Sequence, residues 1–489
     1  MNDSQVKERT LSGVSWRLME RVGAQGVTLV VSVILSRILL PAEYDVVTLA
    51  WAIAMLLELF VDSGLGEALI QKKDADALDF STVFWFNIGV SVVMYLILFF
   101  IAPLVERIYG YPGFARLLRV LGLLILILGV KNVQQAYVAR HFLFKRFFFA
   151  TLGGTVGAAV LGIWMALHGF GAWALVGQHL FNHTVDTLIL WLTVPFRPTA
   201  EFSGKRLKEL FRFGWKLLAS AFLNRGFLEI RKIIIGLYYE AQGTLSFYDK
   251  GERFPKIFAT NLNTAIDSVL LSTMSESQDD RERVLSMTRR SLRLTTYLIM
   301  PVMAGLAVCG EPMVILLLTK KWLPCAAFIA LFCGVYALQP IQTANMNAIK
   351  ALGRSDVYLI LDVIRTVISL AVLLVTVRMG ILAVAWGVLL CGVLNFFINA
   401  YPNKKILGYR YLDQLKDILP QTLCSLAMGA AVYAVTLFDL RPVITLLIQV
   451  PLGVVLYLAL SLIFRLDSFG YLVDLIRSML GRSKKEKGN

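Results

Sequence analysis

The stretch at residues 224–232 places charged side chains where a membrane-spanning helix should be most apolar. It reads NRGFLEIRK and lies between the apolar runs LLASAF and IIIGLYY. A charge at the centre of a bilayer costs about 2.5–3.5 kcal/mol on insertion scales, so intramembrane charges face water, a partner or a ligand. At about 100° per residue, Arg225, Glu229 and Lys232 share one helix face, whereas Arg231 points elsewhere. This spacing predicts a solvent-filled chamber beside the helix.

The basic residues on such faces are suited to an anionic head group. The planar guanidinium of arginine binds phosphate oxygens in a bidentate fashion, and the lysine ammonium neutralises them as a point charge. Similar faces are predicted on the helices around residues 12–39 and 243–270. The residues predicted to bind a phosphate or diphosphate group are Arg21, Arg225, Lys232, Arg253 and Lys256.

Acidic residues lie on the predicted faces at 212–238 and 243–270 and form a smaller acidic face on the predicted span 45–70. Two interpretations of them stay open. They could bind and release H⁺ or Na⁺ during a transport cycle, or they could form fixed ion pairs with basic residues one helical turn away. The residues concerned are Glu58, Asp62, Glu229, Asp249 and Asp267.

The sequence lacks the motifs of common catalytic sites. It contains no phosphate-binding G-x-x-x-x-G-K-[ST] loop, no nucleophile elbow and no paired cysteine spacing typical of a metal site. We therefore expect no enzyme activity, no cofactor and no metal ion. In the first predicted outer loop only Glu43 and Asp45 are acidic, and we expect them to form a solvated turn.

The composition is that of a polytopic membrane protein. Of 489 residues, 57% are hydrophobic, against about 45–50% in ordinary soluble domains, and the mean hydropathy is +0.68. The net charge of +15 is dispersed over short loops, so no nucleic-acid-binding surface is expected. Because the first apolar segment follows a short polar N-terminus and runs into further apolar segments, we expect no cleaved signal peptide.

Windows of about 20 apolar residues predict fourteen transmembrane helices. The predicted inner loops carry far more Lys and Arg than the outer loops, which places both termini in the cytoplasm. The predicted spans are residues 12–39, 45–70, 81–105, 116–138, 148–168, 170–194, 212–238, 243–270, 292–318, 322–349, 356–378, 380–401, 418–438 and 441–465.

An internal repeat divides the predicted spans. Aligning Trp16-Arg17-Leu18 with Trp215-Lys216-Leu217 also aligns residues 41–43 with residues 240–242, which indicates two six-helix lobes followed by two C-terminal helices; chance similarity stays an alternative. Such repeats commonly place the substrate site at their interface. The expected divisions are an N-lobe at 1–195, a cytoplasmic linker at 196–211, a C-lobe at 212–402, two further spans at 403–465 and a basic cytoplasmic tail at 466–489.

Several motifs in consistent order give the chain a resemblance to a known family. They are GVSW (13–16), SGLGEALIQKKD (63–74), STVFWFNIG (81–89), LFRFGW (210–215), FYDKGERFPK (247–256), TKKWLP (319–324) and AIKALGRSDV (348–357). Together they resemble the bacterial polysaccharide exporters of the multidrug/oligosaccharidyl-lipid/polysaccharide superfamily, in the branch for colanic and teichuronic acid type polymers.

This resemblance implies a flippase in the bacterial inner membrane. Its substrate would be an undecaprenyl-diphosphate-linked oligosaccharide for surface polysaccharide or lipopolysaccharide biosynthesis, its partners membrane lipids and polysaccharide-assembly proteins, and its diphosphate ligands Arg21, Arg225 and Arg253. The resemblance further implies a two-lobe bundle with a cavity lined by the first two helices of each lobe. A cation or multidrug antiporter and a lipid II flippase of the same superfamily are the alternatives, ahead of a membrane scaffold or a glycosyltransferase.

Overall fold

The computed structural model describes residues 3–239, 242–275 and 280–472, and within them it leaves the side chains of 3–15, 17, 18, 21, 22, 265–273, 275 and 355 undescribed. These residues fold into helices joined by short connections, and the described part contains no strand. Helices suit a chain of this hydropathy because each helix satisfies its own backbone hydrogen bonds without water. The predicted all-α class is therefore confirmed.

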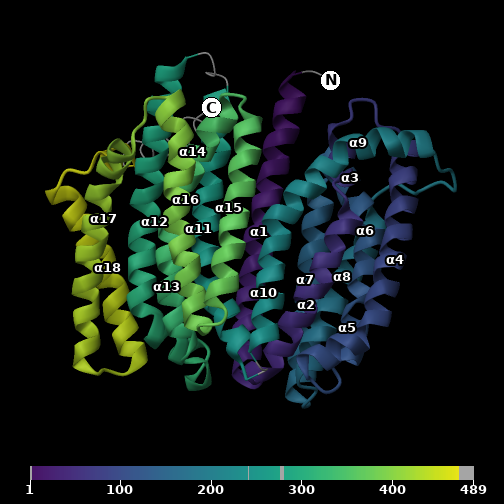
Figure 1. Ribbon diagram of the computed structural model, residues 1–489, viewed down its shortest axis with the longest axis horizontal. Helices are drawn as coiled ribbons and strands as arrows, with labels where there is room; N and C mark the ends of the chain where they lie inside the picture. Colours follow the sequence, from purple (N-terminus) through teal and green to yellow (C-terminus); the bar gives the residue numbers. More distant parts are fainter. Residues whose placement is uncertain (1–2, 240–241, 276–279, 473–489) are drawn as a thin grey trace, which may run out of the picture. The chain divides into compact units, whose positions relative to one another are not determined.

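The chain divides into two compact units, residues 1–246 and 247–489, which Figure 1 colours from purple to teal and from teal to yellow. The helices of the first unit are α1 (Asp3–Ile38), α2 (Pro41–Asp62), α3 (Leu65–Gln71), α4 (Ala77–Tyr109), α5 (Phe114–Leu121), α6 (Leu123–Arg140), α7 (Phe144–Leu167), α8 (Ala172–Thr193), α9 (Gly204–Ala221), the π-helical turn η1 (Phe222–Gly226) and α10 (Phe227–Tyr238).

The second unit is also helical, and its first helix begins in the last residues of the first unit. Its elements are α11 (Thr244–Ser275), α12 (Arg281–Leu317), the 3₁₀ turn η2 (Lys320–Trp322), α13 (Cys325–Ala337), α14 (Gln339–Ala351), α15 (Ser355–Thr376), α16 (Ile381–Ile406), α17 (Tyr411–Ala434), the 3₁₀ turn η3 (Val435–Phe438) and α18 (Pro442–Ile463). Figure 1 shows α17 and α18 side by side at the yellow end of the chain, where they pack against each other and against α12.

Each of the fourteen predicted segments coincides with one helix or with a helix that is broken into two. By length and apolarity, nine stretches of the described residues could cross a membrane. The multi-pass character of the protein is thus confirmed, while the count of fourteen spans and the internal repeat stay predictions. The predicted domain divisions also stay a prediction. The unit boundary at 246 lies after α10, because α10 packs against α2 of the first unit.

The break between α2 and α3 lies within the motif SGLGEALIQKKD. Ser63 and Gly64 have left-handed backbone angles, with φ of 49° and 66°. A Cβ atom on Gly64 would lie 2.5 Å from the carbonyl oxygen of Gly214 on α9. Only glycine permits this approach together with a positive φ. The break turns the chain so that α3 packs against both α6 and α9.

The linker between α8 and α9 is fixed to the start of α4. The indole Nε1 of Trp85 donates to the carbonyl of Thr199 at 2.7 Å, and the N–H of Thr199 donates to Ser81 Oγ at 3.0 Å. These two α4 residues belong to the motif STVFWFNIG. In Figure 1 α9 runs across the ends of its neighbours, and it packs against α3 and α4. The linker is therefore an ordered strap in the first unit.

An acidic cap begins α4 at the same end of the unit. Asp76 accepts a hydrogen bond from the N–H of Asp79 at 2.9 Å and forms an ion pair with Arg206 of α9 at 2.7 Å. The Asp79 N–H, and then the Arg206 guanidinium, hold the pKa of Asp76 below its usual value. Because this carboxylate binds its proton less readily in the folded state, its contribution to stability is present above the ordinary pKa of aspartate and is lost as the pH falls through the lowered value.

The expectation of a solvated turn at Glu43 and Asp45 is wrong. Asp45 is 2% exposed, and its carboxylate accepts the N–H groups of Gly243 at 2.7 Å and Ser246 at 2.6 Å. It thereby satisfies N–H groups at the start of α11, which a helix cannot pair internally. Glu43 accepts the N–H of Leu40 at 2.7 Å and caps its own helix. Both residues have local structural roles.

Candidate substrate-binding site

Arg225 lies in the π-helical turn η1, which joins α9 to α10. Its charge acts on both Glu58 and Asp62 of α2. The neighbouring residue Gly226 is buried, and a Cβ atom there would lie 3.3 Å from Leu59 Cδ1. π-helical turns often mark functional sites. The charges of these three predicted site residues therefore interact electrostatically within the first unit.

The remaining charges on α10 are largely paired. Lys232 Nζ lies 3.5 Å from Glu229 Oε2, as expected for residues one turn apart. Arg231, which the periodicity assigned to another face, is 4% exposed. For Glu229 and Lys232 the geometry favours the ion-pair interpretation over two independent ligands.

In the second unit, α11 carries three further predicted residues. Arg253 and Asp249 are half-buried, and Lys256 is exposed. Between them, Glu252 accepts the hydroxyl of Tyr336 at 3.1 Å, and the Lys250 ammonium lies 4.7 Å from the centre of the Trp322 ring. Buried polar contacts therefore hold α11 in a fixed rotation, with Lys256 on its open side.

Two predicted site residues fall outside the side chains that the structure describes. They are Arg21 on α1 and Asp267 on α11. Their assignments to diphosphate binding and to ion coupling stay predictions.

A buried ion pair in the first unit was missed by the sequence analysis. Lys131 of α6 contacts Asp186 of α8, and each side chain is 6% exposed. The charge of Lys131 also acts on Glu58. The amide of Asn132 influences Glu58 too, although Asn132 Nδ2 lacks a hydrogen bond of normal geometry. The available signal was an isolated charge inside each of two apolar spans, without the helical stripe on which the predictions relied.

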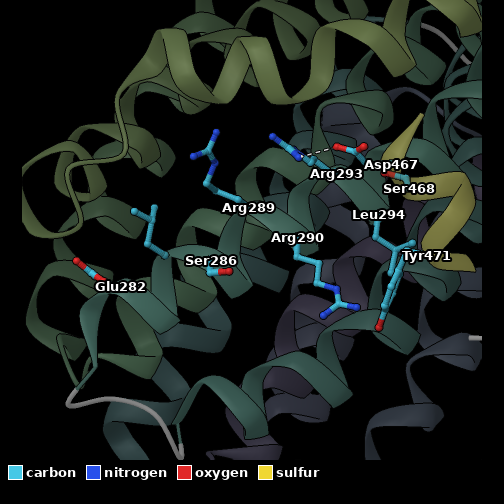
Figure 2. A pocket seen from close by; sticks show the side chains of 10 residues that line it. Glu282, Ser286, Arg289, Arg290, Arg293, Leu294, Asp467, Ser468 and Tyr471 are labelled. Atoms are coloured by element: carbon cyan, nitrogen blue, oxygen red, sulfur yellow. Dashed lines mark hydrogen bonds and ion pairs between the residues drawn. The ribbon is translucent and has the colours of Figure 1, made fainter. Parts of the chain in front are cut away.

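Three arginines on α12 line a pocket of about 460 Å³, shown in Figure 2. The Asp417 carboxylate on α17 accepts hydrogen bonds from Arg289 Nε at 2.8 Å and from Arg293 Nε at 3.0 Å. The Arg290 guanidinium lies 3.6 Å from the centre of the Tyr471 ring. Since Arg289 and Arg293 share the buried carboxylate of Asp417, this cluster joins α12 to α17. Arg290 does not take part in it and instead packs against the ring of Tyr471.

A wide apolar groove of about 710 Å³ runs along α12 in the second unit. Its walls come from α11, α12, α17, α18 and the segment that follows α18. The lining residues are Phe258, Tyr297, Leu298, Pro301, Val302, Gly305, Leu306, Cys309, Met313, Met428, Val432, Leu446, Gln449, Val450, Gly453, Val454, Tyr457, Leu458, Phe469 and Leu472. Its polar groups are mostly engaged: Tyr457 Oη donates to the Tyr297 carbonyl at 2.8 Å and Gln449 Nε2 to the Val432 carbonyl at 3.2 Å. The groove therefore suits a hydrocarbon chain.

In the part of the chain that the structure describes, no group of three His, Cys, Asp or Glu side chains comes together as it would around a metal ion. All five cysteines lie in described segments, are buried and form no disulfide.

Comparison with known proteins gives one family and several relatives. The family model described as "Polysaccharide biosynthesis protein" matches residues 34–327. The chain is 28% identical over 357 residues to the succinoglycan biosynthesis transport protein ExoT of Rhizobium meliloti (strain 1021), covering 72% of each chain. It is 23% identical over 471 residues to the teichuronic acid biosynthesis protein TuaB of Bacillus subtilis (strain 168), covering 93% of this chain and 95% of TuaB.

Solved structures share the fold. The lipid II flippase MurJ in an inward closed conformation matches with a TM-score of 0.75 at 14% identity, over 93% of this chain and 98% of that one. An inward-facing MATE family transporter of the MOP superfamily matches with a TM-score of 0.62 at 16% identity, over 78% and 94%. At these identities the likeness establishes the fold alone.

Proposed function

Because the chain belongs to the polysaccharide biosynthesis protein family, we propose that it is a flippase for undecaprenyl-diphosphate-linked oligosaccharides. In this proposal it moves the lipid from the inner to the outer leaflet of the bacterial cytoplasmic membrane, where the glycan enters surface polysaccharide. Both termini lie in the cytoplasm, in agreement with the excess of Lys and Arg in the predicted inner loops. The chain makes and breaks no covalent bond.

The observation that carries the proposal is the apolar groove along α12. Its walls are almost wholly hydrocarbon, and at about 710 Å³ it lies within the range of about 300–1,000 Å³ typical of small-molecule sites. Phe258 of α11 lines it. Arg253 and Lys256 precede Phe258 by five and two residues on the same helix, and at about 100° per residue they lie on other faces of α11. A ligand in which a long hydrocarbon chain is joined to a diphosphate would match the apolar groove with its chain and the basic residues of α11 with its head group.

The head group would be bound by the arginines. Arg225 is exposed, and its charge interacts with those of Glu58 and Asp62, so an arriving diphosphate would compete with the carboxylates for the guanidinium. When the diphosphate leaves, the two carboxylates interact with Arg225 again. Proton or Na⁺ binding to the carboxylates would then couple the cycle to an ion gradient, since the sequence offers no nucleotide-binding loop. The other proposed ligands are Arg21 and Lys232 in the first unit, where Lys232 is paired with Glu229, and Arg253 and Lys256 in the second unit. Assembly proteins of the polysaccharide pathway would receive the product.

Native mass spectrometry of the purified protein tests this proposal. We expect the wild type to retain an undecaprenyl-diphosphate oligosaccharide and to bind cationic drugs poorly. Since a hydrogen bond to a charged group contributes about 1.5–3 kcal/mol, the variant Arg225→Ala/Arg253→Ala should lose about 100-fold or more in lipid affinity. The matched control Arg212→Ala removes an exposed α9 arginine and should bind normally.

Two acidic residues on α2 are the observation that favours an alternative function. Glu58 and Asp62 would suit the cationic cargo of a multidrug antiporter. Binding of drugs without binding of the diphosphate lipid would replace the flippase by this alternative. Equal retention of lipid II and the oligosaccharide lipid would favour a lipid II flippase.

A further inference from the structure

A small polar pocket lies in the first unit, apart from the groove along α12. Its volume is about 290 Å³. The end of α2, α3, the end of α6 and the start of α7 form its walls. The lining residues are Asp62, Gly66, Glu67, Ile70, Asn132, Gln135, Ala136, Val138, Ala139, Phe144 and Phe147.

The pocket combines side chains that together recognise polyols. Asp62 and Glu67 present carboxylate oxygens, which accept hydrogen bonds from hydroxyl groups. Asn132 and Gln135 contribute carboxamides, which both donate and accept. A sugar ring carries adjacent hydroxyls that need both kinds of partner, and its C–H face needs an apolar wall. The aromatic rings of Phe144 and Phe147 supply such a wall.

The size of the pocket favours a sugar over an ion. Its volume of about 290 Å³ is close to the lower limit of small-molecule sites, about 300 Å³, and far exceeds the space of a dehydrated cation. Within the described residues, no three metal-binding side chains converge at any point. One ring fits this space, and a long glycan would have to continue outside it.

The chain break at Ser63 and Gly64 builds the pocket. It redirects the helix so that α3 packs against α6, and Asp62 and Glu67, on opposite sides of the break, both reach the same cavity. Gly66 forms part of the wall without crowding, because a Cβ atom there would lie 3.7 Å from Asp62 Oδ1 and 3.9 Å from Ala136 Cβ. A larger side chain at this position would extend into the pocket.

The electrostatic interaction between Asp62 and Arg225 relates the pocket to the proposed diphosphate ligand. Asp62 lines the pocket and also interacts with the charge of Arg225. A ligand bound by Arg225 through its diphosphate would therefore bring the next group of its head to Asp62. The walls of the pocket lie at helix ends. The Lys and Arg residues of the adjoining loops predict that these ends face the cytoplasm, which is the side where the substrate would be loaded.

We infer that this pocket binds the sugar residue directly attached to the diphosphate and so selects glycosylated carrier lipid over bare carrier lipid. The inference rests on the proposed function. It assigns glycan recognition to Asp62, Glu67, Asn132 and Gln135, all within the first unit.

The test compares three probes by native mass spectrometry on the full chain: undecaprenyl diphosphate, the same lipid carrying one glucose, and the same lipid carrying one galactose. Two or three additional hydrogen bonds at about 0.5–1.5 kcal/mol each should make the wild type prefer a glycosylated lipid by about tenfold or more. Gly66→Leu fills the pocket and should abolish the preference, whereas Gln135→Ala removes one amide and should reduce the preference several-fold. Binding of the bare lipid should be unchanged in both variants.

The controls are Gly89→Leu, at an exposed α4 glycine with open space around it, and Gln71→Ala, at the exposed end of α3. Both should keep the preference. The inference is overturned if the wild type shows no preference for either sugar, or if the pocket variants retain it or lose the bare lipid as well. Competition by free glucose or galactose would overturn the assignment to lipid-linked sugar. Failure of the wild type to bind any of the three lipids would instead refute the proposed function itself.

Discussion

Charged residues inside the first unit interact with residues of opposite charge. Lys131 forms an ion pair with Asp186. The charge of Arg225 acts on Glu58 and Asp62, and all of these residues lie in predicted membrane helices. Taking a single charge out of water is costly, and a partner offsets that cost when the geometry is good. The two groups differ in exposure: the Lys131–Asp186 pair is buried, whereas Arg225 is exposed. We therefore assign stability to the buried pair and ligand binding to the exposed arginine.

The buried pair gives a stability prediction. Lys131→Met leaves the Asp186 carboxylate buried without its cation, and Asp186→Leu does the reverse, so each should cost about 3–5 kcal/mol. The double variant Lys131→Met/Asp186→Leu should recover most of that loss, because neither charge remains. The apparent unfolding temperature in detergent, followed by tryptophan fluorescence, measures the three effects. Additive losses in the double variant would contradict the assignment.

Helical periodicity anticipated part of the charge arrangement at the residue scale. It selected Glu58, Asp62 and Arg225, whose charges interact in the structure, because a shared helix face is encoded in the spacing of the chain. Their role in binding stays a prediction. Periodicity missed Lys131 and Asp186, since each is a single charge in an apolar span and their pairing depends on how α6 packs against α8. Periodicity also cannot reveal a pocket whose walls come from four helices.

At the scale of elements, the helices follow from hydropathy but their breaks follow from packing. The predicted span 45–70 is divided at Ser63 and Gly64 because α9 approaches there, and the predicted span 212–238 contains the turn η1. Neither break shows in an average over 20 residues. The motif residues that carried the family resemblance serve mainly in such contacts: Trp85 binds the linker, and Trp322 is fully buried beneath Lys250.

The break between α2 and α3 can be tested with two neighbouring glycines. Gly64→Ala places a Cβ atom 2.5 Å from a backbone oxygen at a positive φ, and forced repacking of this kind costs about 1–3 kcal/mol, in addition to the left-handed strain. Gly66→Ala meets only ordinary contacts, at 3.7 and 3.9 Å. We expect a clearly lower unfolding temperature for the first variant and a wild-type value for the second. Equal values would show that the close approach of α9 has no energetic consequence.

The groove along α12 gives a functional prediction at the same scale. Gly305 lines the groove, and a Cβ atom there would meet only Met428 Cε, at 3.9 Å. Gly305→Leu should therefore fold normally and occupy space needed by the lipid chain. Binding of undecaprenyl-diphosphate oligosaccharide should fall by at least about tenfold, since removing the burial of even two methylene groups costs about 1.6 kcal/mol. Gly89→Leu on α4 is the control, and equal lipid binding by both variants would exclude the groove.

At the scale of the whole molecule, length and composition were sufficient to predict an all-helical, multi-pass protein, because a chain this apolar has few other ways to satisfy its backbone. The division into units was harder to foresee. The predicted second copy of the repeat begins at residue 212, whereas the division between the compact units lies at residue 246, after α10 has packed against α2. Sequence spacing indicates the first boundary and only tertiary contacts determine the second.

Transport itself is the central claim, and a reconstituted flipping assay tests it most directly. Vesicles containing undecaprenyl-diphosphate oligosaccharide with a terminal galactose would be treated from outside with galactose oxidase, with and without the protein. The account predicts that wild-type protein makes the inner-leaflet glycan accessible over time, that Arg212→Ala does the same, and that Arg225→Ala/Arg253→Ala does so much more slowly at equal incorporation. If vesicles with wild-type protein expose no more glycan than protein-free vesicles, under an imposed proton or Na⁺ gradient as well as without one, the chain is not a flippase for this lipid.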